Sequence, residues 1–179
     1  MVDLKIENVI AEAEFESNID LQKIANSIKD VNYNPDHFPG LVYKLKSPKT
    51  VTLIFSKGHS VCTGATSLQN AKAALSIIYK KLKDLNLIQN EKIPNITIQN
   101  IIVSYNFKKK LDLDKVSKNL AATNAEVTYD RKKFPGIIYH DKITDITVLL
   151  FKSGIIVGYG SPILLELDQL LTELEQHYT

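Results

Sequence analysis

The sequence has only one cysteine, Cys62, among its 179 residues. One cysteine excludes an intramolecular disulfide and any zinc site built from several cysteines, and it agrees with a reducing compartment. No run approaches the roughly 18 to 20 apolar residues that a membrane-spanning helix needs. The first residues, MVDLKIENVI, lack the basic region, apolar stretch and cleavage site of a secretory signal. These absences predict a soluble, intracellular protein with no membrane partner.

The sequence also has little net charge and no catalytic motif. The formal net charge is +2, so a nucleic-acid role must show in local placement. His59 and Cys62 would face opposite sides of a strand, which argues against a nucleophilic pair. The stretch GYGSP (158–162) lacks the third glycine of a dinucleotide-binding loop. We therefore predict that the protein is not an enzyme and uses no metal and no cofactor.

What the sequence does contain is an internal repeat. Residues 38–64 align without a gap to residues 134–160, with 10 identities in 27 positions. Upstream, KIENVI (5–10) matches TIQNII (97–102), and IDLQKIANSI (19–28) matches LDLDKVSKNL (111–120). A fixed internal period indicates a duplicated structural unit, so we predict two repeats, residues 1–92 and 93–179.

Each repeat has the same predicted secondary structure. Alternating residues 3–15 predict a strand, and the apolar spacing over 19–29 predicts a helix behind an Asn18 cap. Residues 40–63, rich in β-branched and aromatic side chains with turn signals between them, predict three strands. The stripe of apolar residues from Leu68 to Leu85 predicts a helix over 67–87. We expect an α+β fold in which one sheet face is covered by helices.

The other sheet face would carry many apolar side chains, and a large apolar face open to water is a binding surface by default. The two FPG turns also begin with a phenylalanine, an apolar ring in an unusual place. Phe38 and Phe55 are separated by the same interval as Phe134 and Phe151. A single ring in a turn usually folds back under its own loop, but two copies with the same partner favour a shared function.

The repeated IxN, FPG(L/I)xY and LIF/LLF elements and the first-repeat TG resemble the TATA-box-binding protein family over essentially the whole chain. The first repeat, with YNPDHFPGLVYKLKSPKTVTLIFSKGHSVCTGATS, is very similar to the family pattern. The resemblance implies an archaeal-type core: two pseudo-twofold repeats forming a saddle-shaped, curved antiparallel ten-stranded sheet with four helices on the convex face. The concave face would lie in the minor groove of TATA-box DNA, which family members kink with apolar wedges.

The resemblance also implies roles for particular residues. The DNA-intercalating residues would be Phe38, Phe55, Phe134 and Phe151. The base-contacting residues would be Asn8, Asn100, Thr63, Ile10, Ile102, Leu53, Leu149, Val61 and Val157. The phosphate-contacting residues would be Lys44, Lys46, Lys49, Lys57 and His59. Without DNA, the two asparagines could instead bond neighbouring backbone, and the lysines could be a solvated strand edge.

The second repeat departs from the family at contact positions. Tyr159 stands where a threonine matching Thr63 is usual, and family basic positions hold His140, Asp145, Ile155 and Pro162, while Thr66 replaces a lysine in the first repeat. Fewer phosphate contacts predict weaker binding with a shallower salt dependence, favouring the first repeat.

In the family, an acidic loop before the second FPG turn engages transcription factor B. Here that loop holds Asp130, Arg131, Lys132 and Lys133, so its charge is largely reversed. These four residues are the expected partner-binding site, and the reversal would alter partner choice or association rate.

The expected function is therefore a general transcription factor that binds A·T-rich promoter DNA and nucleates a preinitiation complex. Its partners would be double-stranded DNA, a transcription factor B-like protein and, indirectly, RNA polymerase, and a homodimer of the DNA-free protein stays open. It would be associated with the nucleoid in the cytoplasm, or nuclear in a eukaryote. Two alternatives remain: a diverged paralogue with altered promoter or partner choice, and an adaptor that binds a polypeptide on its apolar face.

Overall fold

The computed structural model describes residues 3–15, 18–92 and 94–178. The first repeat contains β1 (Lys5–Glu14), α1 (Leu21–Ser27), β2 (Val31–Asn32), β3 (Leu41–Lys46), β4 (Lys49–Ile54), β5 (His59–Ala65) and α2 (Leu68–Asp84). The second contains β6 (Ile96–Asn106), α3 (Leu113–Leu120), β7 (Glu126–Thr128), β8 (Gly136–His140), β9 (Thr147–Phe151), β10 (Ile155–Ser161), α4 (Leu164–Leu174) and a short 3-10 helix, Glu175–His177.

The strands form one ten-stranded antiparallel sheet in the order β2-β3-β4-β5-β1-β6-β10-β9-β8-β7. The chain divides into two compact units, an N-terminal unit of residues 8–99 and a C-terminal unit of residues 1–7 with 100–179. The α+β fold and the duplication predicted from the sequence are confirmed. The repeat boundary between residues 92 and 93 stays a prediction.

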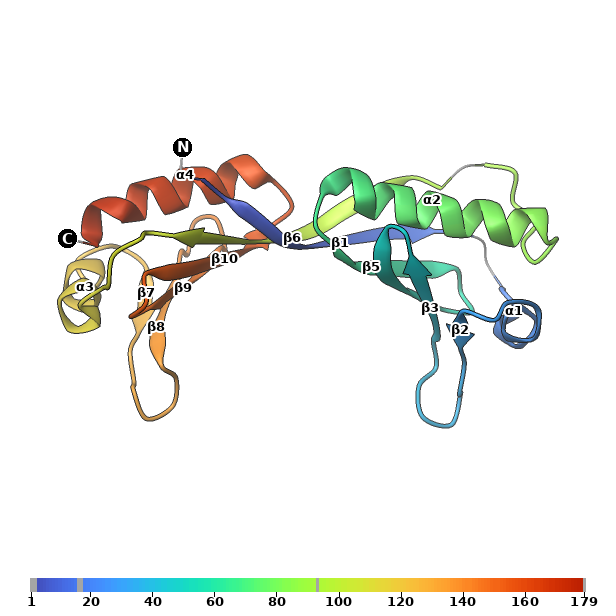
Figure 1. Cartoon of the computed structure of the whole chain (residues 1–179), viewed down its shortest axis with the longest axis horizontal. Coiled ribbons are helices and arrows are strands. Elements are labelled where there is room, and N and C mark those ends of the chain that lie inside the picture. Colours follow the sequence, from blue (N-terminus) through green and yellow to red (C-terminus); the bar gives the residue numbers. More distant parts are fainter. Residues whose placement is uncertain (1–2, 16–17, 93, 179) are drawn as a thin grey trace. The chain divides into compact units, whose positions relative to one another are not determined.

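Strand alternation gives the N-terminal unit two different faces. Along β4, Thr50, Thr52 and Ile54 are buried, whereas Val51 and Leu53 are half-buried. Successive side chains of a strand point to opposite faces, so the buried set packs under the helix. In Figure 1, α2 runs along this side of β5, and the loop between β2 and β3 projects away from it. The half-buried set forms an open face without a helix in the described unit.

Helix α2 covers the buried face because its apolar residues recur at helical spacing. Ser67 caps the first turn by accepting a hydrogen bond from the Asn70 backbone N–H, at 3.1 Å. The helix then buries Ala71, Ala74, Leu75, Ile78, Tyr79 and Leu82. It ends at Asp84, earlier than the prediction of residue 87, so Leu85 is exposed rather than part of the buried stripe.

The short helix α1 corrects a second expectation. Its N-cap is Asp20, whose carboxylate accepts the Lys23 backbone N–H at 2.9 Å, and not Asn18. Asn18 instead has a positive φ of 65°, a turn conformation that asparagine tolerates. Leu21 and Ile24 then face the core. The equivalent helix α3 is capped in the same way by Asp112.

The structure also contains two strands that the residue pattern alone did not predict. Strands β2 and β7 have two and three residues and pair with β3 and β8 at the two ends of the sheet order. Strands this short show no readable alternation. They form because they pair with the neighbouring strand, for example Val31 with Tyr43 and Val127 with Tyr139.

Candidate nucleic-acid interface

The open face of the N-terminal unit collects the base-contacting residues predicted there. Leu53 lies directly opposite Val61 in the β4–β5 ladder, and Val51 lies opposite Thr63. Asn8 and Ile10 have the same half-buried state on β1. Val9, which lies between them in the sequence, points to the other side and is fully buried in the core. The remaining set is an apolar surface with few polar groups.

The C-terminal unit repeats this surface with its own strands. Leu149 lies opposite Val157, and Val157 lies opposite Ser104 on β6. Asn100 and Ile102 are half-buried on the same strand, whereas Ile101 is buried. Each predicted base-contacting residue of the second repeat therefore lies on the side of its strand away from the core.

The four phenylalanines form two ring pairs on the open faces. The centroids of Phe38 and Phe55 are 5.9 Å apart with an interplanar angle of 64°. Those of Phe134 and Phe151 are 5.7 Å apart with an angle of 56°. Phe38 is 37% exposed and the other three rings are half-buried, so none lies under the helices. The first pair meets edge to face and the second is tilted, and in each pair the two rings support one another.

The glycine of each FPG turn leaves room for its ring pair. A Cβ on Gly40 would lie 2.7 Å from Phe38 Cε1 and 2.9 Å from Phe55 Cε1. A Cβ on Gly136 would lie 2.7 Å from the backbone oxygen of Leu150 and 3.1 Å from a Phe134 ring carbon. Any larger residue would push the rings apart or shift the strand.

Asn8 and Asn100 occupy equivalent positions and bond to backbone in the same way. Asn8 Oδ1 accepts the backbone N–H of Gly64 at 2.7 Å, and Asn100 Oδ1 accepts that of Gly160 at 3.0 Å. The ladder register shifts next to both glycines, which have positive φ angles of 90° and 119°. A bulge leaves a backbone N–H without a ladder partner, and the asparagine oxygen supplies the acceptor. The backbone role considered for these residues is therefore present.

This bond fixes which way each amide points, because the oxygen must meet the N–H and the amino group is turned away from it. Asn8 Nδ2 donates one hydrogen bond to Thr63 Oγ1 at 3.0 Å. In the C-terminal unit Tyr159 stands at the position of Thr63, and Asn100 Nδ2 meets no protein acceptor among the described residues. The amino groups are thus available as donors on the open face.

Three of the predicted phosphate-contacting lysines gather at the β3–β4 turn. Lys44, Lys46 and Lys49 are exposed, and Lys46 lies directly opposite Lys49. Like charges opposite one another in a ladder repel. The structure shows no protein anion paired with these lysines in the described residues, so an external anion would relieve the repulsion. Lys57 is exposed in the turn after Phe55.

His59 is placed differently from the lysines. Its Nδ1 lies 2.9 Å from Glu14 Oε1, its Nε2 lies 3.8 Å from Glu12 Oε1, and its ring stacks on Phe55 with centroids 6.1 Å apart. Two carboxylates therefore compete with a phosphate for this side chain. Glu12 also brings a carboxylate to the half-buried side of β1, a feature that the sequence reasoning did not single out.

The equivalent rim of the C-terminal unit keeps only one of the three lysines, because the exposed Lys142 matches Lys46. His140 takes the place of Lys44 and Asp145 that of Lys49. His140 Nε2 lies 3.3 Å from Asp145 Oδ1, and His140 Nδ1 lies 3.2 Å from Thr147 Oγ1. The imidazole and the carboxylate therefore satisfy each other.

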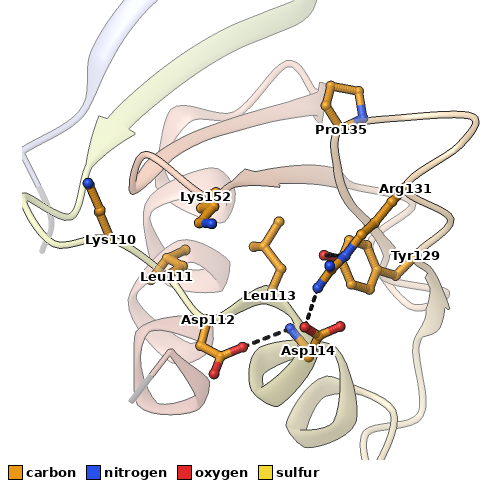
Figure 2. A pocket seen from close by; sticks show the side chains of 9 residues that line it. All are labelled: Lys110, Leu111, Asp112, Leu113, Asp114, Tyr129, Arg131, Pro135 and Lys152. Carbon is orange, nitrogen blue, oxygen red and sulfur yellow. Dashed lines mark hydrogen bonds and ion pairs between the residues drawn. The ribbon is translucent and has the colours of Figure 1, made fainter.

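The predicted partner-binding loop borders a groove in the C-terminal unit, with a volume of about 690 Å³ (Figure 2). Arg131 lines this groove and donates from Nε to the Tyr129 hydroxyl at 2.7 Å and from a terminal nitrogen to Asp114 Oδ2. The hydrogen bond to Tyr129 and the pairing with Asp114 raise the pKa of Arg131. Asp130 accepts the backbone N–H of Lys132, while Lys132 and Lys133 are exposed.

Some open-face residues were missed in the sequence. Val42 pairs with Leu53, Val51 pairs with Thr63, and Ile138 pairs with Leu149. All three are half-buried like their partners. The signal for Val51 was available, because it lies two residues before Leu53 and so shares its face. The other two depend on the register between strands.

The structure places Cys62 and His59 on opposite sides of β5. Cys62 is fully buried and burial raises the pKa of its thiol, whereas His59 lies half-exposed on the other side of β5. Within the ranges 3–15, 18–92 and 94–178, no cluster of three His, Cys, Asp or Glu side chains could hold a metal ion. None of the described helices has the length and apolar character to cross a membrane.

Comparisons with known proteins agree with the duplicated fold. Residues 3–85 and 95–173 match the family described as transcription factor TFIID (or TATA-binding protein, TBP). A TATA-box-binding protein of Methanothermobacter thermautotrophicus is 41% identical over 160 residues, covering 89% of this chain and 86% of that protein. One from Picrophilus torridus is 35% identical over 178 residues, covering 98% and 94%.

A solved structure agrees as well. Methanococcus jannaschii TBP superposes with a TM-score of 0.85 at 32% identity, and the match covers 98% of this chain and 97% of that one. Two sheet-and-helix repeats, ring pairs at equivalent positions and asparagines at equivalent bulges accompany this match. The chain belongs to the TATA-binding protein family of transcription factors.

Proposed function

We propose that this chain, a TATA-box-binding general transcription factor, binds the minor groove of A·T-rich promoter DNA with its open sheet faces and kinks the duplex with its two phenylalanine pairs. It is a transcription factor and not an enzyme. The observation that carries the mechanism is the repeated ring pair. In both units, two contacting rings stand on the face away from the helices, above a glycine that no larger residue can replace without displacing them.

The composition of the open face supports minor-groove binding. In that groove A·T and T·A pairs present only acceptors, whereas G·C adds an amino donor. The half-buried strand residues near Leu53, Val61 and Leu149 could not accept a hydrogen bond from that amino group, so G·C pairs would lose hydration without compensation. The amino groups of Asn8 and Asn100 point away from their bulges and can donate to the base acceptors.

The ring pairs support kinking. Unstacking a base step costs a few kcal/mol, and an inserted ring recovers part of this cost by stacking on the exposed base. The kinked duplex then contacts more of the protein. Because Phe38 leans on Phe55, and Phe134 on Phe151, each pair presents a stiffer wedge than a single ring.

The lysine turn supports stronger phosphate contact by the N-terminal unit. None of the three exposed lysines there is paired with a carboxylate of the described residues. At the equivalent rim of the C-terminal unit, His140 is paired with Asp145. Phosphate contacts position a protein on DNA without reading sequence. The unequal rims, together with Tyr159, favour the variant of this proposal in which the chain is a diverged paralogue with altered promoter preference.

The DNA-bound protein would recruit a transcription factor B-like protein through the loop Asp130–Lys133 and thereby, indirectly, RNA polymerase. It would act where the chromosome lies. Without DNA, the apolar open faces would be covered by a second copy, forming a homodimer.

A TATA duplex tests the proposal directly. We expect a gel shift at low salt with a TATA duplex, and weaker binding when the A·T pairs are replaced by G·C pairs. A folded protein that leaves the TATA duplex unshifted at low salt would contradict both the general factor and the paralogue. That result would favour a protein-binding adaptor instead.

A further inference from the structure

The groove beside the partner loop combines positive charge with an apolar wall. Figure 2 shows Lys110, Lys152 and Arg131 around its opening, with the Leu111 and Leu113 side chains between them. Pro135 and the ring of Tyr129 line the side nearest the loop. Leu111 and Leu113 are almost fully buried, so they form the base, and the exposed walls are cationic and apolar.

The two carboxylates that also line the groove are already engaged. Asp112 caps α3 by accepting the backbone N–H groups of Asp114 and Lys115, and the Asp114 carboxylate is paired with Arg131. By contrast, the ammonium groups of Lys110 and Lys152 have no carboxylate partner among the described residues. The groove therefore offers unbalanced positive charge.

Arg131 is held ready to bind an anion. Its guanidinium has five N–H donors, and the bonds to Tyr129 and Asp114 leave donors unused. The side chain also lies over the Tyr129 ring, 5.4 Å from the centroid. A side chain fixed by such contacts loses little freedom when it binds, which lowers the entropic cost of association.

The first repeat provides an internal comparison for this groove. The positions matching Lys110, Arg131 and Lys152 hold Asn18, Pro35 and Ser56. The base is retained there as Ile19 and Leu21, and the loop again contains a tyrosine, Tyr33. The same local fold therefore forms without any of the three cations, so folding does not require them.

We propose that this groove binds an acidic polypeptide segment, with carboxylates at Lys110, Lys152 and Arg131 and an apolar side chain against Pro135 and Tyr129. The segment belongs to the initiation partner, so the inference rests on the proposed function and gives the chemistry of that partner. A recessed groove with an apolar wall suits a peptide side chain. A DNA backbone, in contrast, gains nothing from the apolar contacts that this wall offers.

A defined peptide tests this inference. The probe is a labelled synthetic peptide of alternating glutamate and leucine, and its binding to the full chain is followed by fluorescence anisotropy. The double variant Lys110→Gln/Lys152→Gln should weaken binding by about tenfold or more, because rim charges control encounter and salt dependence. The matched control Lys80→Gln/Lys83→Gln removes the same charge from α2 and should change binding by less than about twofold. A glutamine-for-glutamate peptide should not bind.

The same variants are assayed for bending of a TATA duplex, which separates this inference from the proposed function. Selective loss of peptide binding with unchanged bending supports the groove. Equal loss in both double variants shows unspecific charge attraction and overturns it. Weaker duplex binding with unchanged peptide binding identifies a DNA contact and also overturns it. If the unmodified chain fails to bend DNA, the proposed function fails while the peptide result still decides the groove.

Discussion

The side-chain amides of Asn8 and Asn100 have two roles, one for the oxygen and one for the amino group. In each, the oxygen accepts a backbone N–H at a bulge, and the amino group is left for another acceptor. An aspartate retains the oxygen and loses the donor. Substitution by aspartate therefore separates the structural role from base contact.

We expect Asn100→Asp to keep the free energy of unfolding close to the original value and to weaken TATA binding by about tenfold or more, since base contacts contribute about 1–3 kcal/mol. Gln99→Glu, which adds the same charge at the adjacent exposed position, is the control. Denaturant unfolding and duplex titration measure the two effects. Equal losses of affinity in both variants would show that charge alone is responsible.

Tyr159 is the residue that most distinguishes the two open faces. At the matching position Thr63 bonds to Asn8, whereas the larger phenol leaves Asn100 without a hydroxyl partner. We expect Tyr159→Thr to raise TATA affinity by a few fold. The smaller side chain leaves more space for DNA on the open face, and its hydroxyl could accept a hydrogen bond from Asn100 as Thr63 does from Asn8. The reciprocal Thr63→Tyr should lower it, and duplex titration compares both. Higher affinity for Thr63→Tyr would mean that the tyrosine itself contacts DNA.

Among the individual residues, duplication drew attention to certain side chains because each occurs twice, and their roles toward DNA stay predictions. The ring pairs and both asparagines stood out in that way. The contacts of His59 with Glu12 and Glu14 could not be predicted, since they depend on the pairing of β1 with β5, whose residues are 45 and more positions apart.

Among the elements, the bulges of β5 and β10 shape the open faces. Gly64 and Gly160 both have positive φ, but a Cβ on Gly160 would lie 2.8 Å from the backbone oxygen of Asp145, whereas one on Gly64 would come no closer than 3.6 Å to a neighbour. A substitution would therefore strain the backbone at both positions, but only at Gly160 would the new Cβ also collide with a neighbour.

We expect Gly160→Ala to lower the free energy of unfolding by about 2–3 kcal/mol and Gly64→Ala by about 1 kcal/mol, because a non-glycine residue at strained positive φ costs about 1–3 kcal/mol. Urea denaturation of each variant measures this. A smaller effect at Gly160 than at Gly64 would show that the β8–β9 loop moves aside without cost.

The elements that the sequence predicted are those with a long periodic pattern. Strand β1 and helix α2 were found within a few residues of their ends, whereas β2 and β7 were not found. Two or three residues cannot show alternation, and such strands form because their neighbours β3 and β8 offer an edge. Asp20 was overlooked as the α1 cap because Asn18, also a capping type, precedes it.

At the scale of the whole molecule, duplication supplies two versions of one surface with different charge. Of the three lysines in the N-terminal turn, only Lys46 is matched in the other unit, by Lys142, and His140 and Asp145 pair there. The duplication and the fold family were readable from the sequence. The groove beside Arg131 was not, because it depends on α3, β7 and the turn after Phe151 meeting in space.

We expect Lys44→Gln/Lys46→Gln/Lys49→Gln to reduce the slope of log affinity against log salt by roughly 0.9 for each phosphate that the variant no longer neutralises. The control Lys80→Gln/Lys81→Gln/Lys83→Gln on α2 should leave the slope unchanged. Titrations of a TATA duplex over a salt series give both slopes. Identical slopes in the two triple variants would place the phosphate-binding residues elsewhere.

The central claim is that ring pairs kink promoter DNA, and fluorescence energy transfer between the ends of a TATA duplex tests it most directly. Binding of the original chain should increase the transfer, because bending brings the ends of the duplex closer together. The account predicts a smaller increase, at saturating concentrations of folded protein, for each of the double variants Phe38→Ala/Phe55→Ala and Phe134→Ala/Phe151→Ala. All four substitutions together should nearly abolish the increase. A folded four-fold variant that bends the duplex as strongly as the original chain would contradict the claim.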